Sequence, residues 1–351
     1  MRATVDSLRP PAQGISEILI VDDGSTDGTA AIAAALARED PRIRILTHPL
    51  RSGKSAAINH AATRATGTLL LTVDVDTVAA PGSVPALAAA FRNPAVAVAS
   101  GNVTIRNAAR NPLTALQSLE YLQSIALGRG FLDHLGSVGC CSGAFSMFRR
   151  APFLAAGGLN VGPGEDLEIT LRLREAGHRT RFIGSAMAAT LAPTTLPRLI
   201  RQRLRWDRDA LAIRLFAYRQ ILPFRRGESL GSTLERLDFL LFDLAATLVF
   251  PFYLLHVALR FGEAFTPLMA GVLLLLSGIA TANLLLVHLA LRRLPTLPEL
   301  AVIPAFALYQ GIVLRFLRFF AFSDELLFAG SHRDAFVPPR IRRALYGRDG
   351  T

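Results

Sequence analysis

The chain has 351 residues, of which 51% are hydrophobic, and its formal net charge at pH 7 is +11. This length exceeds that of a usual single domain, and this hydrophobic content is high for a soluble protein, so we expect two units and membrane segments. The two cysteines, Cys140 and Cys141, are adjacent. That spacing excludes a disulfide framework and a cysteine metal site, and it is typical of a reducing compartment.

Positive charge gathers in two places, between Arg198 and Arg226 and after Arg333, and both adjoin apolar segments. A basic excess is also typical of nucleic-acid-binding proteins. Basic residues beside apolar runs favour an anionic lipid surface instead, so we expect the lipid bilayer as a partner and no nucleic acid. The short polar segment before Pro11 predicts no signal peptide.

Strands and helices alternate in the first half of the chain. Strands are predicted over residues 16–21, 42–46, 68–73, 96–105 and 142–148, and helices over about 28–38, from 53 onward, 81–92 and 112–127. This alternation predicts an α/β fold, with a doubly wound, Rossmann-type domain.

The first predicted strand runs into Asp22 and Asp23, and Asp27 can cap the helix that follows. Carboxylates at a strand end can accept hydrogen bonds from a ribose or a base N–H. The alternative is an Asx-type turn with a helix cap, and the two interpretations are compatible.

Gly53, Lys54 and Ser55 open the next helix. A P-loop would need a glycine at position 48, where the chain has His48, so that motif is excluded. Lys54 is the only lysine in an arginine-rich chain. A compact ammonium at a helix start can meet a phosphate, although chance also explains a single lysine.

The third predicted strand, residues 68–73, ends in Asp74 and Asp76. Side chains alternate along a strand, so acids two residues apart are expected to point the same way. Ligands of open α/β sheets bind at the carboxyl ends of strands, and paired carboxylates there suit a hard cation. Two solvated acids in a turn are the alternative.

Glu165 and Asp166 begin an amphipathic helix, where the helix dipole favours negative charge with or without a catalytic role. Residues 196–218 form a basic amphipathic helix, the pattern of a helix lying on a membrane surface. This helix carries the segment 202–206, Gln-Arg-Leu-Arg-Trp, with the chain's only tryptophan. An interfacial anchor among snorkelling arginines is the simpler interpretation of that tryptophan.

Residues 239–259 and 267–291 are long and apolar enough to span a bilayer. Residues 301–314 form a shorter segment. With the preceding domain inside, Arg292 and Arg293 are also inside, as the positive-inside rule requires. A full third span would place the basic tail outside, which favours a re-entrant third segment or a different number of spans.

Together these motifs resemble the inverting family 2 glycosyltransferases, in the membrane-bound processive branch of poly-N-acetylglucosamine, cellulose, chitin and hyaluronan synthases. The resemblance covers about residues 3–220, and the membrane part is similar only in kind. It is carried by five motifs in the family's order, which are Val21–Asp27, Gly53-Lys54 with Asn59, Asp74-Val75-Asp76, Gly164-Glu165-Asp166 and Gln202-Arg203-Leu204-Arg205-Trp206.

The resemblance implies a GT-A-like nucleotide-diphospho-sugar transferase domain over residues 1–194 and an interface helix over 195–234. It also implies two to three transmembrane helices over 235–322 and a basic tail over 323–351. The expected protein is a multi-pass protein of the cell membrane with a cytoplasmic catalytic domain. Its expected partners are a UDP-sugar donor, a glycan acceptor and a polysaccharide-export or small membrane subunit.

The resemblance also implies residue roles. Asp166 is the expected general base, with Glu165 beside it. The remaining expected roles are uridine binding by Asp22 and Asp23, donor and Mg²⁺ or Mn²⁺ binding by Asp74 and Asp76, phosphate contact by Lys54, and closure over the diphosphate and acceptor by Gln202, Arg205 and Trp206.

The implied reaction is transfer from a UDP-sugar, with UDP-N-acetylglucosamine favoured, to a growing polysaccharide. Transfer of a single sugar to a lipid-linked acceptor and an inactive truncated membrane subunit are the alternatives. One departure favours the last: family members usually have a strand and an extended segment before the helix that here starts near Ala3. That strand would be central in the sheet, so we expect a misassigned start, a strand supplied otherwise, or an impaired protein.

Overall fold

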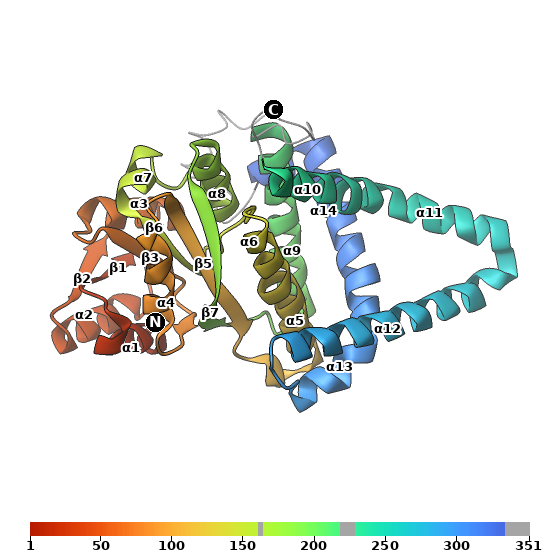
Figure 1. Ribbon diagram of the computed structural model, residues 1–351, viewed down its shortest axis with the longest axis horizontal. Coiled ribbons are helices and arrows are strands. Elements are labelled where there is room, and N and C mark those ends of the chain that lie inside the picture. The colour runs from red at the N-terminus through yellow and green to blue at the C-terminus, as the bar shows by residue number, and fades with distance from the viewer. Residues whose placement is uncertain (161–163, 218–228, 334–351) are drawn as a thin grey trace. The chain divides into compact units, whose positions relative to one another are not determined.

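The structure is a computed structural model that describes residues 1–160, 164–217 and 229–333. The chain divides into two compact units, which we describe separately (Figure 1). Among the described residues, the α/β unit comprises 1–103 and 132–190 together with His332 and Arg333. The helical unit comprises residues 104–131 and 191–331.

The α/β unit contains two separate sheets. In the first, β1 (Ile18–Asp22) pairs in parallel with β2 (Ile43–Thr47), and α2 (Thr29–Glu39) connects them. The second sheet has the order β3-β6-β5-β7-β4, with antiparallel pairs β3–β6, β5–β6 and β4–β7. Its strands are β3 (Leu69–Val73), β4 (Val78–Ala79), β5 (Val96–Ile105), β6 (Phe145–Arg149) and β7 (Arg179–Thr190). The α/β class agrees with the prediction, but the sheet is mixed.

Helices flank these strands (Figure 1), and most begin where the sequence predicts. In the α/β unit they are α1 (Arg2–Leu8), α3 (Lys54–Arg64), α4 (Ser83–Ala89), α7 (Arg150–Ala155) and α8 (Glu165–Glu175). The short α6 (Gly130–His134) lies where the chain returns from the helical unit. Strand β7 was not predicted from the sequence.

Strand β5 forms the buried centre of the second sheet, because its apolar run Val-Ala-Val-Ala is covered on both faces. Gly101 in this strand leaves no room for a side chain. A Cβ there would lie 2.4 Å from the Phe145 ring and 2.5 Å from the Ala186 carbonyl oxygen. The close approach of β5 to its neighbours therefore depends on this glycine.

Replacing Gly101 by Ala is expected to destabilise the α/β unit by about 2–3 kcal/mol, because the added methyl overpacks a buried strand. Thermal unfolding of the purified variant measures the loss. Gly184→Ala in β7 is the matched control, since its Cβ would meet only Phe182, at 3.7 Å. Equal melting temperatures for the two variants would contradict the packing argument.

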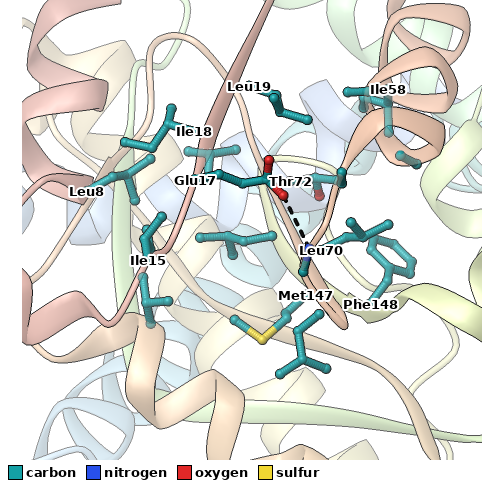
Figure 2. Close-up of a pocket in the computed structure, with 18 of the residues that line it drawn as sticks. Leu8, Ile15, Glu17, Ile18, Leu19, Ile58, Leu70, Thr72, Met147 and Phe148 are labelled. Carbon is teal, nitrogen blue, oxygen red and sulfur yellow. Dashed lines mark hydrogen bonds between the residues drawn. The ribbon is translucent and has the colours of Figure 1, made fainter. Parts of the chain in front are cut away.

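A cavity of about 990 Å³ separates the two sheets. Figure 2 shows Ile18 and Leu19 of β1 facing it from one side and Leu70, Met147 and Phe148 of β3 and β6 from the other. Among the strands that the structure describes, β1 pairs only with β2 and β3 only with β6. Strands β1 and β3 therefore each turn an unpaired edge toward an apolar cavity.

Strands β1 and β3 run in the same direction. Ahead of both, the Glu17 carboxylate accepts hydrogen bonds from the backbone N–H groups of Thr66 and Gly67, at 2.5 and 3.2 Å. Past their carboxyl ends, Asp23 and Asp74 both contact the start of α3. The cavity therefore lies between two parallel strands tied together at both ends.

In the described part of the chain, the helical unit is formed by α5 (Pro112–Tyr121) with its continuation to Arg129 and by six further helices. These are α9 (Leu196–Leu211), α10 (Leu230–Asp238), α11 (Ala246–Phe261), α12 (Phe265–Ala290), α13 (Leu297–Leu308) and α14 (Arg315–Phe328). Helix α13 packs on α5 and α12, and α14 packs on α9 and α11. Leu119, Leu199 and Phe306 belong to one buried cluster in this unit.

Two helical stretches, Leu230–Ala290 and Leu297–Phe328, are long and apolar enough to cross a membrane. The first contains α11 and α12, which correspond to the two predicted spans. The second differs from the expected short segment over residues 301–314, because the helix continues past Arg315 and Arg318 to Phe328. The predicted tail beyond Arg333 lies outside the described residues.

Candidate active site

Asp22 and Asp23 follow β1 and hold the loops around them. Asp22 is buried, and its Oδ1 accepts a hydrogen bond from the Ser25 N–H at 2.9 Å, an Asx-type turn. Asp23 accepts hydrogen bonds from the N–H groups of Ser52 and Gly53, at 2.8 and 2.7 Å. Asp23 thereby fixes the start of α3, whose first residue is Lys54.

Asp23 also contacts His48, which sequence reasoning had used only to exclude a P-loop. His48 Nδ1 lies 2.8 Å from Asp23 Oδ1, and His48 Nε2 lies 2.9 Å from Nδ1 of His60. Burial raises the pKa of Asp23, but the hydrogen bonds from His48, Ser52 and Gly53 outweigh burial and hold that pKa below its ordinary value. Asp23 is therefore ionised at neutral pH.

Lys54 is the centre of a charged cluster that we call the Lys54 cluster, comprising Lys54, Asp74, Gly143, Glu165 and Asp166. Its Nζ lies 2.7 Å from Asp74 Oδ1, 3.3 Å from Glu165 Oε1 and 3.4 Å from the Gly143 carbonyl oxygen. Burial alone would lower the pKa of Lys54, but Asp74 and Glu165 outweigh it and raise the pKa above its ordinary value. The ammonium is therefore charged and held among carboxylates.

Asp166 enters the Lys54 cluster from the first turn of α8. Its Oδ2 accepts a hydrogen bond from the Gly143 N–H at 3.0 Å, and its Oδ1 accepts one from the Leu167 N–H at 2.8 Å. Burial raises the pKa of the adjacent Glu165; Lys54 opposes this rise and Asp166 adds to it. The helix start thus presents two neighbouring carboxyl groups with different surroundings.

Gly143 joins the two sides of the Lys54 cluster, and no sequence motif pointed to it. A Cβ at this position would lie 3.1 Å from Lys54 Nζ and 3.5 Å from Asp166 Oδ2. Only a residue without a side chain lets the loop approach both groups. The contact between Gly143 and Lys54 could not be predicted from one sequence, because the two residues are 89 positions apart.

Asp74 and Asp76 lie in a turn, which corrects the argument from strand alternation. Strand β3 ends at Val73, and the Thr77 N–H closes the turn by donating to the Asp74 carbonyl oxygen at 2.9 Å. Asp74 contacts Lys54, whereas Asp76 Oδ1 accepts a hydrogen bond from Thr190 Oγ1 at 3.2 Å. Their side chains are therefore placed by the turn and not by the period of a strand.

This turn can supply only part of the coordination shell of a divalent cation. Within residues 1–160, 164–217 and 229–333, no three His, Cys, Asp or Glu side chains are grouped to enclose a metal. Mg²⁺ is often held by one or two carboxylates, with substrate phosphates and water completing its shell. Asp74 and Asp76 are half-exposed oxygen donors of that kind.

The other predicted site residues, Gln202, Arg205 and Trp206, lie on α9 in the helical unit. Trp206 is 37% exposed. Gln202 Oε1 is buried and has no hydrogen-bond partner among the described residues. The α/β unit thus brings Asp23, Lys54, Asp74, Glu165 and Asp166 together, and the tryptophan motif belongs to the helical unit.

Comparison with known proteins agrees with these observations. Residues 1–155 match the family model described as Glycosyl transferase family 2. Proteins named N-acetylglucosaminyltransferase are similar: one from Rhizobium leguminosarum bv. viciae is 36% identical over 60% of this chain, and one from Sinorhizobium fredii is 34% identical over 68%. The chain spans 51% and 62% of the lengths of these two relatives.

A solved structure shows the same fold. The mannosyltransferase PcManGT from Pyrobaculum calidifontis, in complex with GDP-Man and Mn²⁺, superposes with a TM-score of 0.60 at 19% identity. The superposition covers 92% of this chain and 81% of that one. The fold is therefore the GT-A-like α/β domain with a curled mixed sheet, followed by long apolar helices. Residues 1–155 therefore carry the sequence pattern described as Glycosyl transferase family 2, and the chain is similar to part of proteins named N-acetylglucosaminyltransferase.

Proposed function

We propose that the protein is a membrane-bound inverting glycosyltransferase that moves a sugar from a UDP-sugar to a growing polysaccharide. UDP-N-acetylglucosamine is the favoured donor, because the similar proteins are named N-acetylglucosaminyltransferase. The Lys54 cluster is the observation that carries the proposal. It places a cation, a metal-suited turn and a carboxylate at a helix start within one site.

The residues of the cluster have separate roles in this reaction. Lys54 exchanges its contact with Asp74 for a contact with the donor diphosphate, and Asp74, together with Asp76 from the same turn, would hold Mg²⁺ or Mn²⁺. The metal, when bound, neutralises the charge that develops on the leaving UDP. Asp166 takes the proton from the attacking acceptor hydroxyl. One displacement without an enzyme nucleophile inverts the anomeric centre.

The helical unit supplies the acceptor side and the membrane. Trp206 offers an aromatic face for a sugar ring, and Gln202 and Arg205 bind the donor diphosphate or the acceptor. The two apolar stretches from Leu230 anchor the protein in the cell membrane with the α/β unit in the cytoplasm. There the site meets the nucleotide-sugar pool and a partner that exports the product.

Membranes that contain the protein are expected to convert radiolabelled UDP-N-acetylglucosamine into polymer. EDTA should stop the reaction and added Mn²⁺ or Mg²⁺ should restore it, because Asp74 and Asp76 need the metal to bind the diphosphate. UDP-glucose and GDP-Man serve as comparison donors, and linkage-resolved mass spectrometry identifies the product. Short products on lipid would favour transfer to a lipid-linked acceptor. Absence of transfer from every donor by folded protein would favour an inactive subunit.

A further inference from the structure

Arg203, inside the tryptophan motif of α9, links a buried acid to the indole ring. Its Nη1 and Nη2 lie 2.8 and 3.0 Å from the two carboxylate oxygens of Glu120, which is on α5. The guanidinium carbon lies 4.7 Å from the centroid of the Trp206 ring. Arg203 therefore makes a forked ion pair on one side and a cation–π contact on the other.

The carboxylate of Glu120 is itself held in place. The Tyr309 hydroxyl, which follows α13, donates a hydrogen bond to Glu120 Oε2 at 2.9 Å. Tyr309 is 4% exposed, and the side chains of Glu120 and Arg203 are each 11% exposed. All of these residues lie in the helical unit. The series of side-chain contacts from Tyr309 through Glu120 to Arg203 thus ends at Trp206, which is more than one-third exposed.

A buried ion pair between α5 and α9 has a simpler explanation as a fastening between helices, and such pairs often add little to stability. Two features are not explained by the attachment of α5 to α9 alone. The fork fixes the plane of the guanidinium, and the guanidinium carbon lies 4.7 Å from the ring centroid of the one side chain of the motif that is suited to stack on a sugar. A methionine or leucine pair would fasten the helices without orienting the indole.

We propose that Glu120 is a positioning residue, which holds Arg203 against Trp206 and so fixes the orientation of the indole that an acceptor sugar stacks on. This inference rests on the proposed function, because it assigns the exposed part of Trp206 to the acceptor. Tyr309 completes the arrangement by fixing the carboxylate.

Trp206 is the chain's only tryptophan, so its fluorescence reports on this arrangement without any turnover. The test compares the wild type with Glu120→Gln and Tyr309→Phe in detergent. Arg198→Gln, an exposed position on the same helix, is the matched control. Emission, acrylamide quenching and the response to added N,N′-diacetylchitobiose are measured with and without UDP. Circular dichroism and gel filtration establish that each variant is folded.

In Glu120→Gln we expect red-shifted emission and stronger quenching, with about tenfold weaker chitobiose binding, because the charge-assisted fork is lost. Tyr309→Phe should change the fluorescence and the chitobiose affinity in the same direction, but by less. Arg198→Gln should change neither the fluorescence nor the affinity. Donor KM should change by less than acceptor KM, because the variants act on Trp206, which is assigned to the acceptor. This pattern supports the proposal even if Glu120→Gln folds poorly, since Tyr309→Phe keeps the ion pair.

Unchanged emission and unchanged chitobiose affinity in both folded variants would overturn the positioning role, and a lowered melting temperature alone would show a fastening. A shift in emission without any response of wild-type Trp206 to chitobiose would overturn the acceptor assignment. Failure of the proposed function looks different: wild-type membranes then transfer no sugar from any donor. A purely structural pair would also leave the ratio of acceptor KM to donor KM unmoved.

Discussion

Replacing Asp166 by Asn is expected to lower kcat for sugar transfer about a thousandfold, because the amide cannot take the proton of the acceptor hydroxyl. The substitution keeps the size of the side chain. An amide oxygen can still accept the hydrogen bond from the Gly143 N–H, which Asp166 Oδ2 now receives at 3.0 Å. The loop and Lys54 should therefore stay in place. Radiolabel transfer measures kcat, and calorimetry with UDP and Mn²⁺ measures nucleotide binding.

UDP affinity in Asp166→Asn should remain within about twofold of the wild type, because the amide oxygen keeps the hydrogen bond from the Gly143 N–H and only the contact with the Leu167 N–H inside the helix start is lost. Glu175→Gln, at the exposed end of the same helix, is the matched control and should retain transfer. Glu165→Gln should weaken nucleotide binding instead, since Glu165 contacts Lys54. Retained turnover in Asp166→Asn would assign the proton transfer to another group.

The sequence predicted the elements whose local pattern is strong. Strands β1 and β3 are apolar runs at whose carboxyl ends aspartates lie, and α8 starts at acids and alternates leucine with charge. Strand β7 was missed because Arg179–Thr190 is rich in alanine with a central glycine, both of which are depleted in strands. Tertiary pairing with β4 and packing beside β5 override that preference.

The site was predicted as a set of residues but not as a geometry. Lys54, Asp74 and Glu165 come from three separate motifs, each of which pointed to its own residue independently of the other two. Their contacts could not be predicted, because they depend on how α3, the turn after β3 and α8 converge. The contact of Asp23 with His48 and the need for glycine at position 143 have the same origin. Neither leaves a pattern in neighbouring residues.

A strand added ahead of Met1 is expected to raise the melting temperature of the α/β unit by about 5–10 °C. The cavity of about 990 Å³ lies between two parallel strands, each with an unpaired edge. Five β-branched residues span about 17 Å in extended form, the length of β1 or β3. Burial of their side chains and pairing of both edges outweigh the cost of ordering so short a segment.

The start of α1 lies where such a strand would end. Thr4 Oγ1 donates a hydrogen bond to the Val75 carbonyl oxygen at 2.7 Å, just past the carboxyl end of β3, and Met1 lines the cavity. A strand parallel to β1 and β3 therefore delivers the chain directly to α1, which leads on to β1. This sequence of elements is a βαβ unit, whose crossover is right-handed in nearly all proteins. The connection to α1 and the pairing with β1 and β3 thus both require the added strand to run parallel to β1 and β3.

The test fuses a Val- and Ile-rich heptapeptide and a short Gly linker to Met1, and the control extension has Pro and Asp at the apolar positions. Hydrogen exchange should slow at the β1 and β3 amides only with the first extension, because a parallel strand pairs with both edges. Since Asp23 and Asp74 stand at the ends of these strands, UDP should also bind more tightly. Equal exchange and equal melting with both extensions would mean that the cavity is not a strand position, and that the two sheets are stable as separate halves.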